Sequence, residues 1–269
     1  MSALSPFLEN AIARIAATEH LLLALDFDGT LAPTVDDPDS ARAHPDATAA
    51  IVALIGLPNT RVAIVSGRAL GSLEKVIELP DAVILVGSHG AEFRIDGEES
   101  GPKLELDEHV LLDRLCTTLE DVASRYPGAR TERKPAGCGL HTRLSSSADA
   151  ASAWEHALRE VGTLDSASDA GSGHRISHRT GKDILEFTVR NADKGMAIGS
   201  LRERVDATAV MFIGDDVTDE DGFVALSETD VGIKVGDGHT AAEYRVAGTN
   251  DVVTILQRLA GERERVLSS

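Results

Sequence analysis

Five short apolar runs constrain the fold of this chain more than any other feature of its sequence. The runs are nearly continuous rather than alternating, and they cover residues 21–25, 62–65, 83–86, 210–213 and 231–235. Strands of this kind are buried on both faces, as in a parallel sheet covered by helices. Helical patterns lie between them, at residues 45–54, 70–77, 194–205 and 219–226. The alternation predicts an α/β fold with a Rossmann-like, doubly wound parallel sheet.

The middle of the chain follows a different pattern. From Leu111 to Tyr126, apolar residues recur at steps of three and four, which predicts a long amphipathic helix that ends at a Pro-Gly pair. Two short strands over residues 129–135 and 138–144, a second helix around Trp154, and a hairpin turning through residues 180–182 follow it. We therefore expect an inserted α+β domain over residues 103–188, and a core that is discontinuous in sequence over residues 1–102 and 189–269.

The composition excludes several classes of partner. A formal charge of −18 and an aromatic content of 3% argue against nucleic acid and against an anionic membrane surface. No apolar run approaches the roughly 20 residues needed to span a bilayer, and the first ten residues lack the pattern of a signal peptide. We expect a cytoplasmic protein. Cys116 and Cys138 are predicted to be buried or half-buried free thiols without assigned chemistry.

Two acids follow the first buried strand. Because side chains two residues apart in a strand point the same way, Asp26 and Asp28 should share one small volume at the strand exit. Two carboxylates at such a short distance repel one another unless a cation binds between them. Carboxylate and carbonyl oxygens suit Mg²⁺. Gly29 permits a tight turn after the pair, and Thr30 can offer its hydroxyl and amide to an anion.

Three further element ends carry polar residues. They are Ser66 with Gly67 after the second strand, Lys194 at the start of a helix, and Asp215, Asp216 and Asp219 after a later strand. Lys194 is an unusual choice because the helix dipole is already positive there, and an anion between them would resolve the conflict. Asp215, nearest the strand end, is the best candidate metal ligand of the acidic group. Taken alone, each of these features is more often a helix cap or a solvated loop.

Along the chain come an acid pair after the first strand, a hydroxyl at Ser66, an ammonium at Lys194 and a second acidic group that begins at Asp215. In this order, these features resemble the four motifs of the haloacid dehalogenase superfamily of phosphotransferases. The resemblance implies that Asp26 is the nucleophile and forms an aspartyl-phosphate. It implies that Asp28 is general acid and then general base. It also implies the binding residues: Asp26, Asp215 and the backbone carbonyl of Asp28 for Mg²⁺, Asp216 and Asp219 for metal-bound waters or for Lys194, and Thr30, Ser66, Gly67 and Lys194 for the phosphate.

A narrower resemblance covers most of the chain. The stretches LDFDGTLAPTVDDPDSA, VAIVSGR, VGSHGAEF, GKDILEF and FIGDDVTDED look like the trehalose-6-phosphate phosphatases, which release trehalose and phosphate from trehalose 6-phosphate. Sugar phosphatases of this kind carry a mobile cap between the second and third motifs, where the predicted insert lies. The chain departs from the family in TVRNADKG, since the family commonly has a proline-rich approach to the motif lysine.

The predicted insert also has a polar sheet face. Along its strands, polar residues alternate with apolar ones, so they should share the face opposite the insert's helices. A face with both signs of charge suits the hydroxyls of a disaccharide. The candidate sugar contacts are Glu132, Lys134, His141, Arg143 and Glu186, together with Arg68 and His89 from the core.

Two alternatives to this function remain open at the level of sequence. The substrate can be another sugar phosphate, such as sucrose 6-phosphate, or a phosphate moved within a sugar as in a mutase. A protein of another class, a non-catalytic phosphoacceptor switch, also combines acids, a hydroxyl and a lysine at strand ends. The acidic surface leaves open a contact with the enzyme that makes the substrate.

Overall fold

The computed structural model describes residues 4–35, 37–101, 104–168, 176–181, 183–190 and 192–268. They form two compact units, one from Met1–Ser100 with Ala192–Ser269 and the other from Gly101–Asn191. The segment predicted as an insert, residues 103–188, lies within the second unit; its expected first boundary and Lys182 of its hairpin fall outside the described residues. Among all the described residues, no helix is both long and apolar enough to cross a membrane.

The core unit is built on a mixed sheet of eight strands in the order β12-β11-β10-β1-β2-β3-β4-β5. Their bounds are Leu21–Leu25 (β1), Thr60–Val65 (β2), Ile84–Gly87 (β3), Glu92–Ile95 (β4), Glu98–Ser100 (β5), Ala209–Gly214 (β10), Val231–Val235 (β11) and Tyr244–Val246 (β12). The strands from β12 to β3 are parallel, which confirms the predicted α/β fold. At one edge the sheet becomes mixed, because β4 and β5 pair antiparallel.

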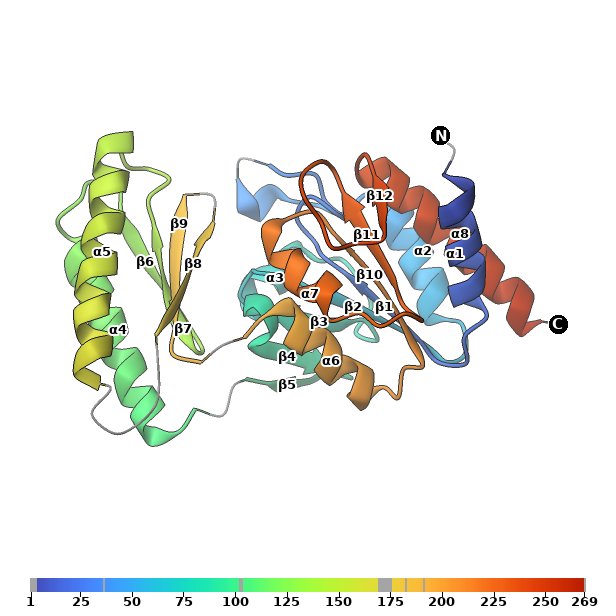
Figure 1. Ribbon diagram of the computed structural model, residues 1–269, viewed down its shortest axis with the longest axis horizontal. Helices are drawn as coiled ribbons and strands as arrows, with labels where there is room; N and C mark the ends of the chain where they lie inside the picture. The colour runs from blue at the N-terminus through green and yellow to red at the C-terminus, as the bar shows by residue number, and fades with distance from the viewer. Residues whose placement is uncertain are drawn as a thin grey trace. The chain divides into compact units, whose positions relative to one another are not determined.

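Helices cover both faces of this sheet (Figure 1). One face packs against α1 (Pro6–Ala16), α2 (Pro45–Ile55), α3 (Leu70–Val76) and α8 (Thr249–Leu267), and the other against α6 (Lys194–Arg204) and α7 (Glu220–Val224). Strand β1 alternates between the two cores, with Leu23 and Leu25 in the first and Leu22 and Ala24 in the second. Since both faces are covered, polar groups can collect only where the strands end.

The second unit has its own antiparallel sheet and its own core. Its strands are Arg130–Lys134 (β6), Gly137–His141 (β7), Ser177–Gly181 (β8) and Ile184–Thr188 (β9), in the order β6-β7-β9-β8. Helices α4 (Leu106–Ala123) and α5 (Ser147–Ser168) cover one face (Figure 1) and pack on residues such as Leu140 and Phe187. Cys116 and Cys138 are buried free thiols in this core, as predicted.

Two predicted elements end earlier than expected. The strand predicted over residues 138–144 stops at His141, because the Ser145 amide donates to the Thr142 carbonyl at 2.9 Å and turns the chain. Leu144 is consequently 79% exposed rather than part of an apolar face. The helix predicted over residues 219–226 is reduced to α7 and is preceded by a 3₁₀ turn, η3 (Val217–Asp219).

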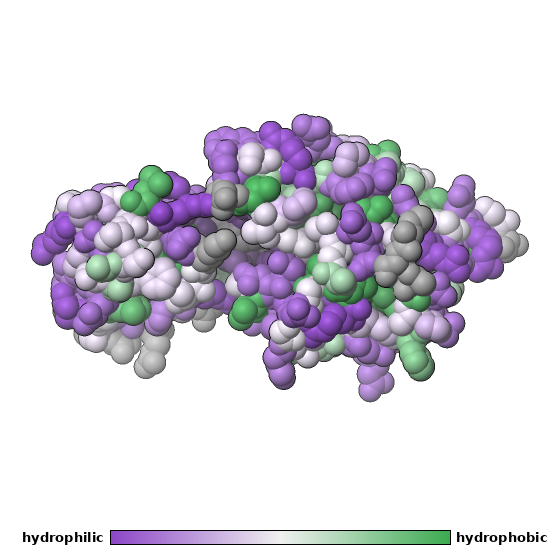
Figure 2. Space-filling view, turned by 90° about the horizontal axis from the view of Figure 1, so that it is seen from above, coloured by the Kyte–Doolittle hydropathy of each residue, from purple (hydrophilic) through white to green (hydrophobic). Residues whose placement is uncertain are grey.

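In the face drawn in Figure 2, hydrophilic residues predominate and the hydrophobic ones form separate spots. Several of the exposed apolar side chains lie on α6, α7 and the turn before α7, namely Met196, Val217 and Val224.

Candidate active site

Parallel pairing of β1 with β10 places the predicted acids next to one another. Leu25 is in register with Ile213, and the Asp26 amide donates to the Ile213 carbonyl at 2.9 Å. The residues that follow these two strands, Asp26 and Asp215, therefore leave the sheet at the same edge. Phe27 turns into the core and is fully buried, as the strand alternation requires.

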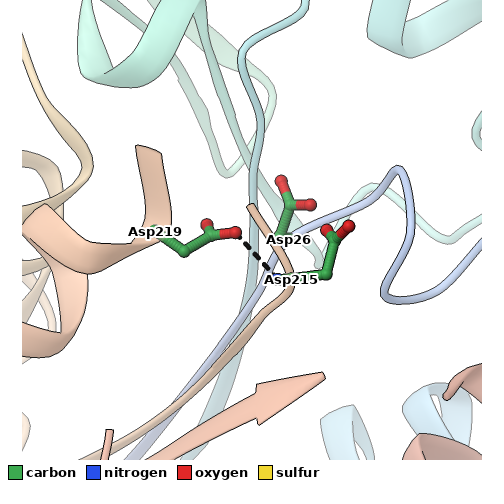
Figure 3. Close-up of side chains that lie close together, drawn as sticks. All are labelled: Asp26, Asp215 and Asp219. Atoms are coloured by element: carbon green, nitrogen blue, oxygen red, sulfur yellow. Dashed lines mark hydrogen bonds between the residues drawn. The ribbon is translucent and has the colours of Figure 1, made fainter. Parts of the chain in front are cut away.

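Asp219 completes a cluster of three carboxylates. One oxygen from each of Asp26, Asp215 and Asp219 lies within 4.8 Å of the others. Figure 3 shows the carboxylates of Asp26 and Asp215 on the same side of the strand ends, with Asp219 reaching in from the start of the following helix. The Asp219 carboxylate also accepts the backbone N–H of Asp215 at 2.9 Å, which ties the cluster to the β10 turn.

The ammonium of Lys194 bridges two members of this cluster. Its Nζ lies 2.6 Å from Asp26 Oδ1 and 2.6 Å from Asp219 Oδ1, in a position that is almost completely buried. Burial alone would lower the pKa of Lys194, but the charges of Asp26 and Asp219 outweigh it and raise that pKa. Lys194 is therefore held charged at the first turn of α6 by two anions.

The same burial acts on the acids in the opposite sense. Burial raises the pKa of Asp26 well above its ordinary value; Lys194 opposes this shift, and the charges of Asp219 and Asp215 add to it. Burial and the charge of Asp219 raise the pKa of Asp215 to about 6. When all groups are ionised, three carboxylates and one ammonium leave two negative charges. An all-oxygen donor set with this charge fits a hard divalent cation.

A glycine after β1 makes room for Asp215. Gly29 has a φ of 85°, and a Cβ built on it would lie 2.0 Å from Asp215 Oδ2. Thr30, fully buried beside it, places its Oγ1 3.4 Å from Asp215 Oδ1. A side chain at position 29 would therefore displace one of the clustered acids.

Asp28 is paired in a way that the sequence did not predict. Its Oδ2 and Oδ1 accept from Nε and Nη2 of Arg68, each at 2.6 Å, so that the arginine binds the carboxylate through two parallel hydrogen bonds. The Asp28 carboxylate is not one of the three clustered carboxylates, because Arg68 binds it instead. Ser66 lies at the end of β2, where its Oγ accepts from the Arg68 amide at 3.1 Å.

Two other predicted site residues, His89 and Asp216, lie outside the carboxylate cluster. His89 sits in a 3₁₀ turn, η2 (Ser88–Gly90), with a φ of 56°. Its ring covers Gly67, where a Cβ would lie 2.5 Å from the His89 Cε1. Asp216 is exposed, and its carboxylate accepts from the Val217 amide at 2.7 Å, so its side chain caps η3 rather than joining the cluster.

In the second unit, four of the predicted sugar contacts form two pairs on the sheet face opposite the core. Lys134 pairs with Glu186, and His141 Nε2 lies 2.8 Å from Glu132 Oε2. The hydrogen bond from His141 lowers the pKa of Glu132. Arg143 is not on this face, because it lies in the exposed turn after β7.

The sequence model of the trehalose-phosphatase family matches residues 24–250, which is most of the chain. The chain belongs to the trehalose-phosphatase family.

Individual relatives agree with this assignment. The chain is 33% identical over 245 residues to the bifunctional trehalose-6-phosphate synthase/phosphatase of Thermoproteus tenax, covering 91% of this chain and 32% of the relative. It is 31% identical over 277 residues to the trehalose-phosphate phosphatase of Mycobacterium leprae, covering 94% of this chain and 62% of the relative. The chain thus spans between about a third and under two thirds of the length of these two relatives.

A solved structure supports the fold of this trehalose-phosphatase family member. The C-terminal domain of C. albicans trehalose-6-phosphate phosphatase superposes with a TM-score of 0.74 at 22% identity, over 96% of this chain and 97% of that one. The shared fold includes the parallel sheet whose strand ends carry Asp26 and Asp215.

Sequence reasoning missed two charged residues that support the site. Glu92 of β4 accepts from the Ser88 hydroxyl at 2.5 Å and from the Leu70 amide at 3.1 Å, and so fixes the loop that holds His89. Lys234 of β11 reaches the turn after β10. The second of these had a signal, because a lysine in the otherwise apolar run VGIKV is unusual for a strand buried on both faces.

Proposed function

We propose that this protein hydrolyses trehalose 6-phosphate to trehalose and phosphate. The observation that carries the proposal is the buried ammonium of Lys194 bridging Asp26 and Asp219 beside Asp215, in a chain of the trehalose-phosphatase family. With its charge compensated by Lys194 and by a divalent cation held between the acids, the Asp26 carboxylate can act as a nucleophile toward an anionic phosphate, which an isolated acid would repel.

The proposed reaction has two steps. An oxygen of Asp26 attacks phosphorus, the bond between phosphorus and the sugar oxygen breaks, and Asp28 gives that oxygen a proton. Water then attacks the aspartyl-phosphate while Asp28 takes up its proton, and phosphate leaves with Asp26 regenerated. Lys194 and the Ser66 hydroxyl bind the phosphoryl oxygens, with Thr30 and Gly67 next to them.

Proton transfer by Asp28 requires a change in its pairing. Both of its oxygens accept from Arg68 in this structure. An oxygen that transfers a proton to the leaving group must be released from that pair, and we propose that substrate binding releases it. Arg68 then remains next to the reacting phosphate, as a cation that can bind one of its oxygens or a sugar hydroxyl.

We propose Mg²⁺ as the cation of the site. Asp26 and Asp215 would hold it together with the Asp28 carbonyl, while Asp219 holds Lys194. When bound, Mg²⁺ supplies positive charge that compensates the carboxylates and the phosphate.

Sugar recognition is proposed for the polar face of the second unit. Glu132, Lys134, His141 and Glu186 present both signs of charge there, which suits the many hydroxyls of trehalose. Arg143 and His89 stay predictions. We also propose a contact with the enzyme that makes the substrate, because the Thermoproteus tenax relative is named as a synthase and phosphatase in one chain.

The test is phosphate release from a small panel of esters. Trehalose 6-phosphate should be turned over with Mg²⁺ at a kcat/KM far above those of sucrose 6-phosphate and glucose 6-phosphate, and a chelator should abolish turnover. Asp26→Asn should remove activity while leaving the fold intact. A preference for another ester would change the substrate, and an isomeric sugar phosphate as product would indicate a mutase. A stable aspartyl-phosphate without repeated turnover would identify a phosphoacceptor switch.

A further inference from the structure

The second buried lysine of the core unit, Lys234, is not used by the proposed reaction. It lies on β11 with 3% of its surface exposed, in a strand whose other residues are apolar. Its Nζ donates to the backbone carbonyl of Asp215 at 2.7 Å and to that of Asp216 at 3.1 Å. The carboxylate of Glu220 lies 3.5 Å from the same nitrogen. Burying an ammonium in this way is costly unless its donors are used, and here they are.

The two carbonyls complete the bonding of the turn after β10. The backbone N–H groups of Asp215 and Asp216 donate to Asp219 Oδ2 at 2.9 and 2.8 Å. All four backbone polar groups of these two consecutive residues are thus bound by side chains, two by Asp219 and two by Lys234. Such a turn has few alternative conformations, so the direction in which the Asp215 side chain leaves the backbone is fixed.

We propose that Lys234 is a positioning residue that preorganises Asp215 for binding a divalent cation. The inference rests on the metal site of the proposed function and assigns part of its affinity to a residue that does not touch the metal. A second positive charge near the site would by itself weaken cation binding. Glu220 pairs with that charge, so we expect geometry to outweigh repulsion. Outer residues that orient metal ligands commonly contribute a factor of about 10–100 in affinity.

The decisive measurement is calorimetric titration of the 269-residue chain with Mg²⁺ alone, in the absence of any ester. Lys234→Met removes the donors while keeping the length of the side chain, and we expect Kd for Mg²⁺ to rise about 10–100-fold. Lys234→Gln keeps a shorter, uncharged side chain with two N–H donors, so its Kd for Mg²⁺ should fall between those of the unsubstituted protein and Lys234→Met. It also supplies the measurement if the methionine variant does not fold. The matched control is Lys75→Met, which removes the same charge from an exposed position on α3.

Melting temperatures of the metal-free proteins separate positioning from simple structural support. A purely structural lysine would lower the melting temperature without changing Kd, and that result would overturn the inference. So would an equal rise of Kd in Lys75→Met. If the unsubstituted protein itself binds no divalent cation, the metal site of the proposed function is wrong. If it binds Mg²⁺ and Lys234→Met binds equally well, only the role of Lys234 is wrong.

Discussion

Burial and the charge of Asp219 raise the pKa of Asp215 from 3.8 to about 6. Between these two values the unfolded chain has released the proton and the folded chain still binds it. The folded state therefore binds more protons, and its stability falls as the pH rises through this window. The sign is opposite to that of an acid in an ordinary salt bridge.

The metal-free protein should show this loss directly. With a chelator present, we expect Asp215 to lower the free energy of unfolding by about 2–3 kcal/mol between pH 4 and pH 6.5. The measurement is urea denaturation at several pH values, for the unsubstituted protein and for Asp215→Asn, because other acids contribute to both. The difference between the two curves should shrink as the pH falls. Parallel curves would contradict the assignment of the shift to Asp215.

The bridging ammonium of Lys194 allows a second test at this scale. Lys194→Met leaves two carboxylates, Asp26 and Asp219, buried without their shared partner. We expect the metal-free variant to lose about 3–5 kcal/mol of stability at pH 7, and less at pH 5, where protonation can relieve the repulsion. Urea denaturation at the two pH values measures this, with Lys75→Met as the exposed control. A loss that is the same at both pH values would count against repulsion as its cause.

Individual residues also show what the sequence can and cannot predict about the site. The sequence predicts Asp26, Asp215 and Lys194 as site residues because each lies at the end of a buried element. Parallel strands bring such ends together. The Asp28–Arg68 pair could not be predicted from the sequence, because it depends on how two side chains that follow different strands turn toward one another. Sequence spacing carries no information about that choice.

At the scale of an element, the turn after β1 is shaped by the acid that packs against it. Position 29 requires glycine for two reasons. Its φ is 85°, and a Cβ there would lie 2.0 Å from Asp215 Oδ2. Gly97, in the hairpin between β4 and β5, has nearly the same φ of 82° with no heavy atom within 4 Å of its Cβ position. A side chain at position 97 would therefore cause backbone strain alone, whereas a side chain at position 29 would cause the same strain and also displace Asp215.

Alanine at the two positions should give different results. Gly97→Ala should cost about 1 kcal/mol of stability from the left-handed backbone alone and leave turnover unchanged. Gly29→Ala should add the displacement of Asp215, and we expect at least a 100-fold loss of kcat/KM for the phosphate ester together with weaker Mg²⁺ binding. Steady-state kinetics and denaturation on both variants test this. Equal behaviour of the two would show that Asp215 tolerates displacement.

The elements themselves were predictable to different degrees. The five apolar runs became strands within two residues, since burial on both faces leaves a strong pattern. The β4–β5 hairpin was missed, although its Asp96-Gly97 turn is a hairpin signal, because the preceding runs favoured a parallel continuation. The overlong strand at residues 138–144 failed for another reason, since alternation alone does not show where a turn breaks the pairing.

At the scale of the whole molecule, the two units have separate hydrophobic cores in the described part of the chain. Arg263 of α8 is fully buried in the core unit, at the amino ends of the strands and therefore opposite the site. Its guanidinium donates to Thr60 Oγ1 at 2.6 Å and to the carbonyls of Ala16, Thr18 and Asn59 at 3.0, 2.9 and 2.7 Å. One side chain thus joins the last helix to the segments that lead into β1 and β2.

Loss of Arg263 should therefore loosen one unit and spare the other. Arg263→Met leaves several buried carbonyls without donors, and we expect it to cost the core unit about 3–5 kcal/mol. Arg258→Met, on the same helix but half exposed and paired with Glu262, should cost less than about 1 kcal/mol. Hydrogen exchange followed by peptide should rise across β1, β2 and α8 in the first variant.

The strands and helices of the second unit should keep their exchange rates in Arg263→Met, because they share no core residues with the first unit. The affinity for Mg²⁺ per folded molecule should also stay within about twofold, since Arg263 lies at the amino ends of the strands and the acids lie at their carboxyl ends. An equal rise of exchange in α4, α5 and β6–β9 would show that the two units unfold together. In that case separate cores would not imply separate stabilities.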